Sequence, residues 1–230
     1  MISVFETRAI RLHRLPPYHT SHRQTAGSTT VPDVPECSMP NPQARPVLCV
    51  VSGPPGSGKS TLARALAHDI GVPAIIRDEI KQGMVLATTP ARDTGYDDLD
   101  IPTLRAFFDV LTVLARAGVS VVAEAAFQDK LWRPNLMPLA EFAEIRIIHC
   151  TAPQSVLHAR IAHRAATVPH RHAHNDGDLL ASIAAGTHTA DAFVPVRMDV
   201  AELTVDTTDG FRPGLDAIAK FVSQPCRGAD

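Results

Sequence analysis

The sequence predicts an α/β fold: a three-layer αβα domain on a mostly parallel five-stranded sheet, with a helical lid. A wholly apolar run over residues 47–51 leads into a glycine-rich turn, and the turn opens a segment of helical periodicity. Strand-like and helix-like segments then alternate to the end of the chain. Short apolar runs are typical of strands buried on both faces, and parallel strands need helical crossovers that cover the sheet.

The elements follow in order along the chain. Strands are predicted over residues 47–51, 74–77, 119–123, 145–150 and 203–205. Helices are predicted where apolar residues recur three or four positions apart, over residues 61–70, 101–115 and 215–222, and another is expected to begin at Glu79. Gly71 follows the predicted helix over residues 61–70, and Gly118 follows the one over residues 101–115. A glycine readily ends a helix at such a position.

The glycine-rich turn fits the phosphate-binding pattern G-x-x-x-x-G-K-S/T. Its backbone amides and the start of the next helix can surround a polyphosphate, a lysine adds a positive charge, and a hydroxyl can bind Mg2+. The sequence therefore predicts ATP as ligand and Ser60 as the residue that holds Mg2+. The predicted nucleotide-binding residues are Gly53, Pro54, Pro55, Gly56, Ser57, Gly58, Lys59, Ser60 and Thr61.

Two carboxylates stand at the predicted carboxyl ends of strands, where ligands bind in sheets of this kind. Asp78 is predicted to accept the proton of an attacking hydroxyl, and Lys59 to act on the transferred phosphoryl group. The alternative for Asp78 is an N-cap on the helix that follows. Glu124 is predicted to hold Mg2+ through water or to bind substrate hydroxyls, and its alternative is a structural carboxylate.

A basic interval without Asp or Glu extends over residues 145–175. Arg160 and Arg164 are four positions apart, so one helix face would carry both, as in a lid that closes over a phosphoryl group. The alternative is a solvated basic face. Three histidines in this interval predict a basic loop near substrate, with a metal tract as the alternative: His170, His172 and His174.

An acidic stretch over residues 88–100 is predicted to form part of an acceptor pocket, with an exposed loop as the equal alternative. The net charge of -2 and the aromatic content of 5% argue against a nucleic-acid partner. The four cysteines form no C-x-x-C pair, and Cys49 and Cys150, which lie in apolar runs, are predicted to be buried thiols in a reducing cytoplasm. No membrane span is expected, because Arg116 and Glu124 interrupt the best apolar candidate.

The chain divides by composition. Residues 1–45 are rich in proline, lack an apolar period and are predicted to be a disordered tail; a transit peptide is the alternative. Residues 46–224 are predicted to form one domain with a lid around 153–190, and residues 225–230 a short tail.

Several of these segments together resemble a known family. The segments over residues 50–63, 76–81, 160–164 and 205–208 are similar to P-loop kinases, often called AAA family ATPases, of the zeta-toxin and chloramphenicol-phosphotransferase type. The resemblance covers about residues 46–224. It implies a nucleoside-kinase-like sheet, ATP with Mg2+ and transfer to a small hydroxyl. It also implies that Asp78 accepts the proton and that Arg133 contacts phosphate.

We therefore expect a kinase that transfers the terminal phosphoryl group of ATP to a hydroxyl of a small molecule. Two alternatives remain: a nucleotide-binding ATPase or regulator without an acceptor, and a toxin-like kinase that acts on a nucleotide sugar or a nucleic-acid end. Asp78 and the arginine pair favour a kinase over a passive binder. Neither the acceptor nor the oligomeric state follows from the sequence.

Overall fold

The computed structural model describes residues 45–87, 99–167, 176–185 and 193–224. The chain divides into two units, residues 1–41 and 42–230, and all described residues belong to the second. The predictions for residues 1–44, for the tail at 225–230 and for most of the stretch 88–100 lie outside the described residues, as do those for His170, His172 and His174.

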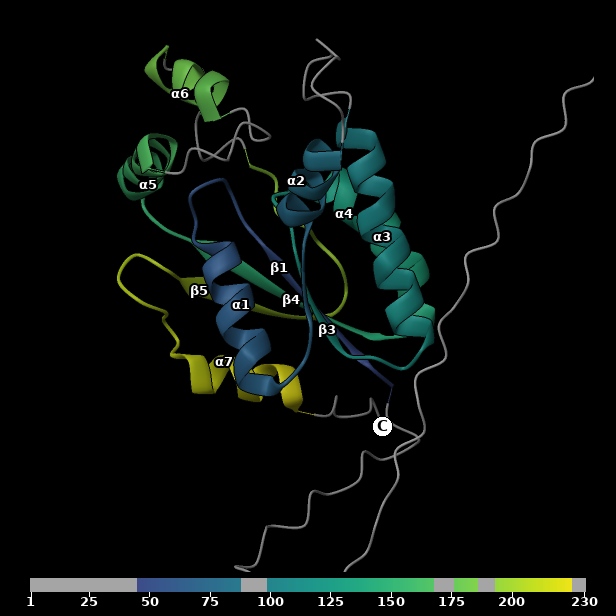
Figure 1. Ribbon diagram of the computed structural model, residues 1–230. Coiled ribbons are helices and arrows are strands. Elements are labelled where there is room, and N and C mark those ends of the chain that lie inside the picture. The colour runs from purple at the N-terminus through teal and green to yellow at the C-terminus, as the bar shows by residue number, and fades with distance from the viewer. Residues whose placement is uncertain (1–44, 88–98, 168–175, 186–192, 225–230) are drawn as a thin grey trace, which may run out of the picture. The chain divides into compact units, whose positions relative to one another are not determined.

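A parallel five-stranded sheet forms the middle layer, as predicted (Figure 1). The strands pair in the order β2-β3-β1-β4-β5, so β1, which precedes the glycine-rich turn, is central. Its register places Val51 beside Glu124 and Ser52 beside His149. The strands are β1 (Val47–Ser52), β2 (Ala74–Ile76), β3 (Val121–Glu124), β4 (Glu144–Thr151) and β5 (Ala201–Asp206).

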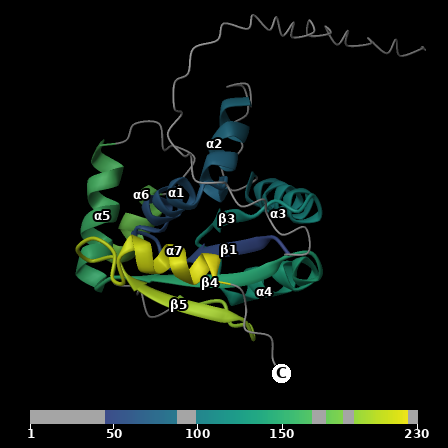
Figure 2. The ribbon, with the colours of Figure 1, turned by 90° about the horizontal axis from the view of Figure 1, so that it is seen from below.

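Helices cover both faces of this sheet (Figure 2). One face packs on α1 and α7, and the other packs on α3, α4 and the short helix η2, while α5 and α6 lie together near the glycine-rich turn. The helices are α1 (Lys59–Ile70), α2 (Arg77–Ala87), α3 (Asp100–Arg116), α4 (Asp129–Leu136), η2 (Met137–Glu141), α5 (Gln154–Thr167), α6 (Asp176–Ala184) and α7 (Leu215–Ser223).

The continuous apolar strands are explained by burial on both faces. Along β1, Leu48 and Val50 join the core with α3 and α4, whereas Cys49 and Val51 join the core with α1 and α7. Successive side chains of a strand point to opposite faces, so a strand covered on both sides must be apolar throughout. The sheet is thereby held rigidly, and its carboxyl edge offers a fixed platform for a site.

The two described cysteines confirm the prediction of buried thiols. Cys49 and Cys150 are both buried and carry no disulfide. Burial, which disfavours the thiolate, raises the pKa of each to about 12. Both therefore stay protonated and serve as small apolar core residues.

The start of α2 differs from the prediction. Arg77 was expected to end the second strand and Glu79 to begin the helix, but α2 begins at Arg77. Asp78 thus lies in the first turn of the helix rather than at its N-cap. The reason is tertiary: Arg77 pairs with Asp100 at the start of α3, and such a contact overrides local propensity.

Among the described residues, no helix combines the length and the apolar composition that crossing a bilayer requires.

Candidate active site

The glycine-rich turn forms a closely packed loop between β1 and α1. Gly53 and Gly56 have φ angles of 152° and 81°, where side-chain-bearing residues are rare. A Cβ on Gly53 would lie 2.4 Å from the carbonyl oxygen of Cys150, and one on Gly56 would lie 2.6 Å from that of Leu157. Both positions require glycine because β4 and α5 press against the loop. Residues 53–58 are called the phosphate loop from here on.

Donors gather at the phosphate loop. Gly58 precedes α1 without any side-chain cap, so the first amides of the helix keep their capacity to bind an anion. The ammonium of Lys59 lies across the loop and donates to the carbonyl of Pro54 at 3.0 Å. The buried hydroxyl of Ser57 has no hydrogen-bond partner among the described residues. These groups suit a polyphosphate.

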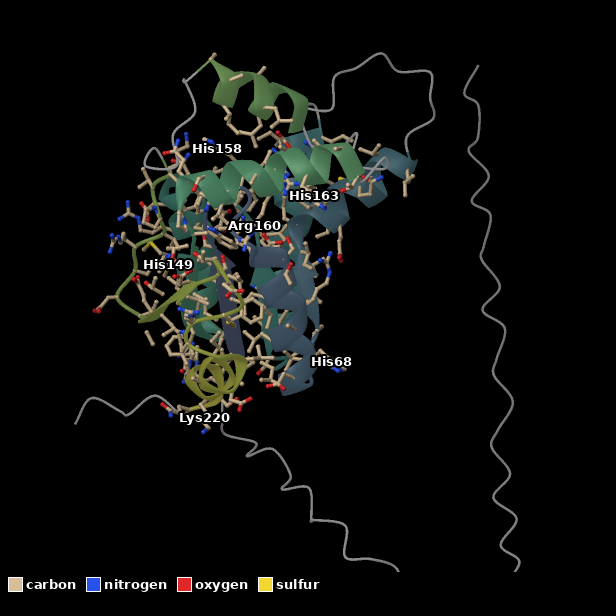
Figure 3. All side chains as sticks on the ribbon, turned by 90° about the vertical axis from the view of Figure 1, so that its left-hand side faces the viewer. His68, His149, His158, Arg160, His163 and Lys220 are labelled. Carbon is tan, nitrogen blue, oxygen red and sulfur yellow. The ribbon has the colours of Figure 1, made fainter. Side chains whose placement is uncertain are left out.

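The phosphate loop is held from outside by two side chains. The hydroxyl of Thr207 lies 2.9 Å from the carbonyl oxygen of Ser57 and 3.1 Å from that of Thr151. Arg160, which extends from α5, donates to the carbonyl oxygens of Gly56 at 3.3 Å and of Thr207 at 2.5 Å (Figure 3). Sequence reasoning missed Thr207 as a supporting residue, although the resemblance includes its segment.

A hydroxyl and a carboxylate meet beneath the loop. Ser60 donates a 2.7 Å hydrogen bond to Oε2 of Glu124, which ends β3 and is 4% exposed. Burial raises the pKa of Glu124; the charge of Lys59 and the bond from Ser60 oppose this rise, and the charge of Asp78 adds to it.

These two oxygen donors fit the chemistry of Mg2+, which prefers hard oxygen ligands. Among the described residues, no group of three or more His, Cys, Asp or Glu side chains could hold a metal. Ser60 and Glu124 would therefore complete a shell made mainly of phosphate oxygens and water, as is usual for Mg2+ with a nucleotide.

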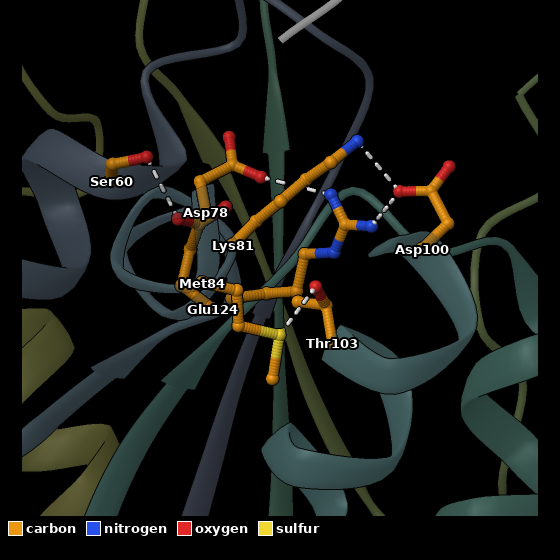
Figure 4. Close-up of polar contacts among 8 residues, drawn as sticks. Ser60, Asp78, Lys81, Met84, Asp100, Thr103 and Glu124 are labelled. Atoms are coloured by element: carbon orange, nitrogen blue, oxygen red, sulfur yellow. Dashed lines mark hydrogen bonds and ion pairs between the residues drawn. The ribbon is translucent and has the colours of Figure 1, made fainter. Parts of the chain in front are cut away.

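Asp78 lies next to this pair, in the first turn of α2 (Figure 4). Its Oδ1 accepts from Nη1 of Arg77 at 3.4 Å, and 40% of its side chain is exposed. Its charge acts on Glu124, so the two carboxylates lie near one another. The structure thus brings together Lys59, Ser60, Asp78 and Glu124 from three separate segments.

Three further charged side chains lie near Asp78, where α2 meets α3: Arg77, Lys81 and Asp100. Asp100 accepts from Lys81 at 2.8 Å and from Arg77 through the same oxygen, Oδ1. Burial alone would raise the pKa of Asp100, but the hydrogen bonds from Lys81 and Arg77 lower it on balance. Sequence reasoning missed Lys81 and Arg77, because ion pairs between α2 and α3 leave no local pattern.

The remaining predicted arginines take different positions. Arg133 forms an ion pair of 3.0 Å with Asp129, one turn earlier on α4, and is 55% exposed. Arg164 is partly buried on α5, one turn beyond Arg160. A pocket of about 490 Å³ opens along one face of α5 and is lined by Ser155, Val156, Ala159, Arg160 and His163. Because Arg160 also contacts the phosphate loop, pocket and loop are neighbours.

The sheet topology and the phosphate loop together define a P-loop kinase fold, and comparison with known proteins agrees. The model of the AAA domain family matches residues 48–182, more than half of the chain. The chain therefore belongs to the AAA domain family. This membership confirms the predicted resemblance to P-loop kinases. A search of the curated proteins finds no match.

Comparison with solved structures finds similar chains. A "putative kinase" from Chloroflexus aurantiacus is 24% identical over 77% of this chain and 97% of its own, with a TM-score of 0.67. A gluconokinase from Sinorhizobium meliloti is 23% identical over 77% and 89%, with a TM-score of 0.42. The Mycobacterium tuberculosis APS kinase in complex with AMPPNP and APS is 19% identical over 77% and 95%, with a TM-score of 0.46. The likeness to the first of these structures, at 24% identity, concerns the fold alone.

Proposed function

We propose that this protein is an ATP-dependent kinase that phosphorylates a hydroxyl of a small molecule. One observation carries the proposal: the bonded pair Ser60 and Glu124 lies beneath the phosphate loop, and Asp78 lies beside it. A passive nucleotide binder needs the loop and a metal position, but its ligand does not require a further half-exposed carboxylate beside them. A kinase needs such a group for the attacking hydroxyl.

The loop would receive the phosphates of ATP. Amides at the start of α1 point at this position, and Lys59 would exchange its bond to Pro54 for the outer phosphates. The pocket along α5, beside Arg160, would receive the base. Ser60 and Glu124 would hold Mg2+, which offsets the charge of the phosphate oxygens.

Asp78 would act on the acceptor. The acceptor oxygen forms a bond to the terminal phosphorus of ATP while Asp78 takes the hydroxyl proton. The bond between that phosphorus and the oxygen it shares with the next phosphate breaks, and ADP leaves with the electron pair. The half exposure of Asp78 leaves it accessible to a substrate.

The helices α5 and α6 would form the lid. Arg160 donates to carbonyl oxygens of the phosphate loop and of the segment after β5. It would therefore hold the lid in a fixed position against the loop. Arg164, one turn further on, would offset charge on the phosphoryl group during transfer. Arg133 would be a further phosphate contact if α4 and its ion pair with Asp129 rearrange.

Transfer of labelled phosphate tests the proposal. Purified protein with ATP labelled at the terminal phosphate and Mg2+ is incubated with pools of sugars, nucleosides, hydroxy acids, aminoglycosides and oligonucleotides. We expect label on a small-molecule product and loss of transfer in Asp78→Asn. Label released only as inorganic phosphate, whatever pool is present, would instead support an ATPase without an acceptor.

A further inference from the structure

Lys81 is a buried cation in the wall that α2 and α3 form beside Asp78. Its side chain is only 5% exposed, and its ammonium pairs with Asp100 at 2.8 Å. Taking an ammonium out of water is costly unless an anion accompanies it. The accompanying anion, Asp100, is itself 46% exposed, so a solute can reach it.

Arg77 depends on the same carboxylate oxygen. Its Nη2 bonds Oδ1 of Asp100, which also accepts from Lys81, while its Nε is buried without a hydrogen-bond partner among the described residues. Nε and Nη2 form one edge of the guanidinium, which binds a carboxylate through two parallel hydrogen bonds. Asp100 therefore accepts from only one of the two nitrogens on this edge. Its Oδ1 is shared by Arg77 and Lys81.

This cluster lies next to Asp78, where the acceptor hydroxyl is proposed to bind. Lys81 follows Asp78 by three residues on α2, so their Cβ atoms lie roughly 5–6 Å apart on the same helix face. Figure 4 shows Lys81 between Asp78 and Asp100, with the ammonium of Lys81 and a carboxylate oxygen of Asp100 turned toward each other. An acceptor whose hydroxyl meets Asp78 would extend along Lys81 and Arg77.

We infer that the acceptor carries an anionic group, a carboxylate or a phosphate, a few bonds from its reactive hydroxyl, and that Lys81 and Arg77 bind this group in place of Asp100. The inference rests on the proposed function for the position of the hydroxyl. The exchange preserves the local charge, because one anion replaces another and Asp100 turns to water. A carboxylate would also supply the missing acceptor for Nε of Arg77.

Calorimetric titration with a dicarboxylate, malonate, tests the inference before any acceptor is known. The protein is first saturated with AMPPNP and Mg2+, so that the phosphate loop is filled, and malonamide serves as the neutral counterpart. We expect malonate to bind at least tenfold more tightly than malonamide. Lys81→Met keeps the apolar stem of the side chain and should remove this preference. Inorganic phosphate, titrated in the same way, shows which of the two anions fits better.

Two control variants match the charge changes. Lys220→Met alters an exposed lysine on α7, which Figure 3 places far from Arg160, and Asp109→Asn alters an exposed acid of α3. Both should bind malonate like the parent protein. Asp100→Asn removes the competing carboxylate and should tighten malonate binding at least tenfold. Melting temperatures of all variants establish that each is folded; if Asp100→Asn is not, Lys81→Met alone decides.

Malonate binding that is absent, or equal in Lys81→Met and the parent protein, would overturn the inference, and the cluster would then only tie α2 to α3. The proposed function is judged separately, by whether AMPPNP binds. If it does not bind, malonate is titrated without nucleotide and Lys81→Met is compared with Lys59→Met. If malonate binding is lost in Lys81→Met but kept in Lys59→Met, the anion site is supported although AMPPNP does not bind. If binding is kept in Lys81→Met but lost in Lys59→Met, malonate binds at the phosphate loop and the inference is overturned.

Discussion

The hydroxyl of Ser60 and the carboxylate of Glu124, 64 positions apart in the chain, are joined by a 2.7 Å hydrogen bond. The bond connects the first turn of α1 to the end of β3, across the central part of the sheet. Because Val51 pairs with Glu124 in register, β1 delivers the phosphate loop to the same edge at which the carboxylate ends its strand. This relationship brings together two oxygen donors that are unrelated in sequence.

Glu124→Gln should separate metal binding from stability. We expect transfer to fall by about 10–100-fold, as when a group near a metal is lost. Burial raises the pKa of Glu124, so protonated Glu124 favours the folded state below the ordinary glutamate pKa of about 4.3, and this contribution is lost as the pH rises through the folded value. The variant should therefore melt at or above the parent temperature at pH 7.

A melting series from pH 4 to pH 8 checks the second half of that prediction. The advantage of Glu124→Gln should shrink as the pH falls, because Glu124 is then neutral in both states. A variant that melts well below the parent protein at pH 7 would show that ionised Glu124 stabilises the fold through Lys59 and Ser60, against the direction of its pKa.

Lys59→Met should weaken the binding of ATP with Mg2+ by about 10–100-fold, since a hydrogen bond to a charged group contributes about 1.5–3 kcal/mol. Methionine retains the stem of a side chain that is 7% exposed, so the fold should persist. Titration calorimetry measures the affinity, with Lys220→Met as the control. Parent protein that binds no ATP would remove the basis of the proposed function.

Asp78→Asn should leave the melting temperature and ATP affinity near parent values while transfer falls by about a hundredfold or more. Asparagine keeps the shape of the side chain but cannot take a proton. Steady-state rates with the acceptor found by label transfer give kcat and KM. Full activity in a folded variant would assign proton transfer to another group, with Glu124 the next carboxylate to test.

Arg160→Ala and Arg164→Ala should differ from each other. Arg160 bonds the carbonyl oxygens of Gly56, Thr207 and Thr208, so its loss should lower the melting temperature and ATP affinity along with turnover. Arg164→Ala should lower turnover by up to about a thousandfold with little effect on either. Thermal melting, calorimetry and turnover on both variants make the comparison. Normal turnover in Arg164→Ala would show that this part of α5 is only a basic surface without a role in transfer.

The chain's local patterns were sufficient to predict the phosphate loop and the five strands, whereas α4, η2 and α6 were not predicted. Gly53, Gly58, Lys59 and Ser60 act as neighbours in one turn, and their chemistry depends on spacing along the chain, which a sequence displays directly. The same holds for the buried strands, whose apolar runs record burial on both faces. Asp78 and Glu124 were predicted because both follow strands whose carboxyl ends share one edge.

Only the tertiary structure decided which side chains meet. The start of α2 at Arg77, the clamp of Arg160 on Thr207 and the shared oxygen of Asp100 each join elements distant in sequence. Such contacts depend on strand order and register and on how helices pack, and these follow from the burial of the whole core rather than from any local spacing. Local chemistry therefore determined where phosphate can bind, and packing decided which charges surround it.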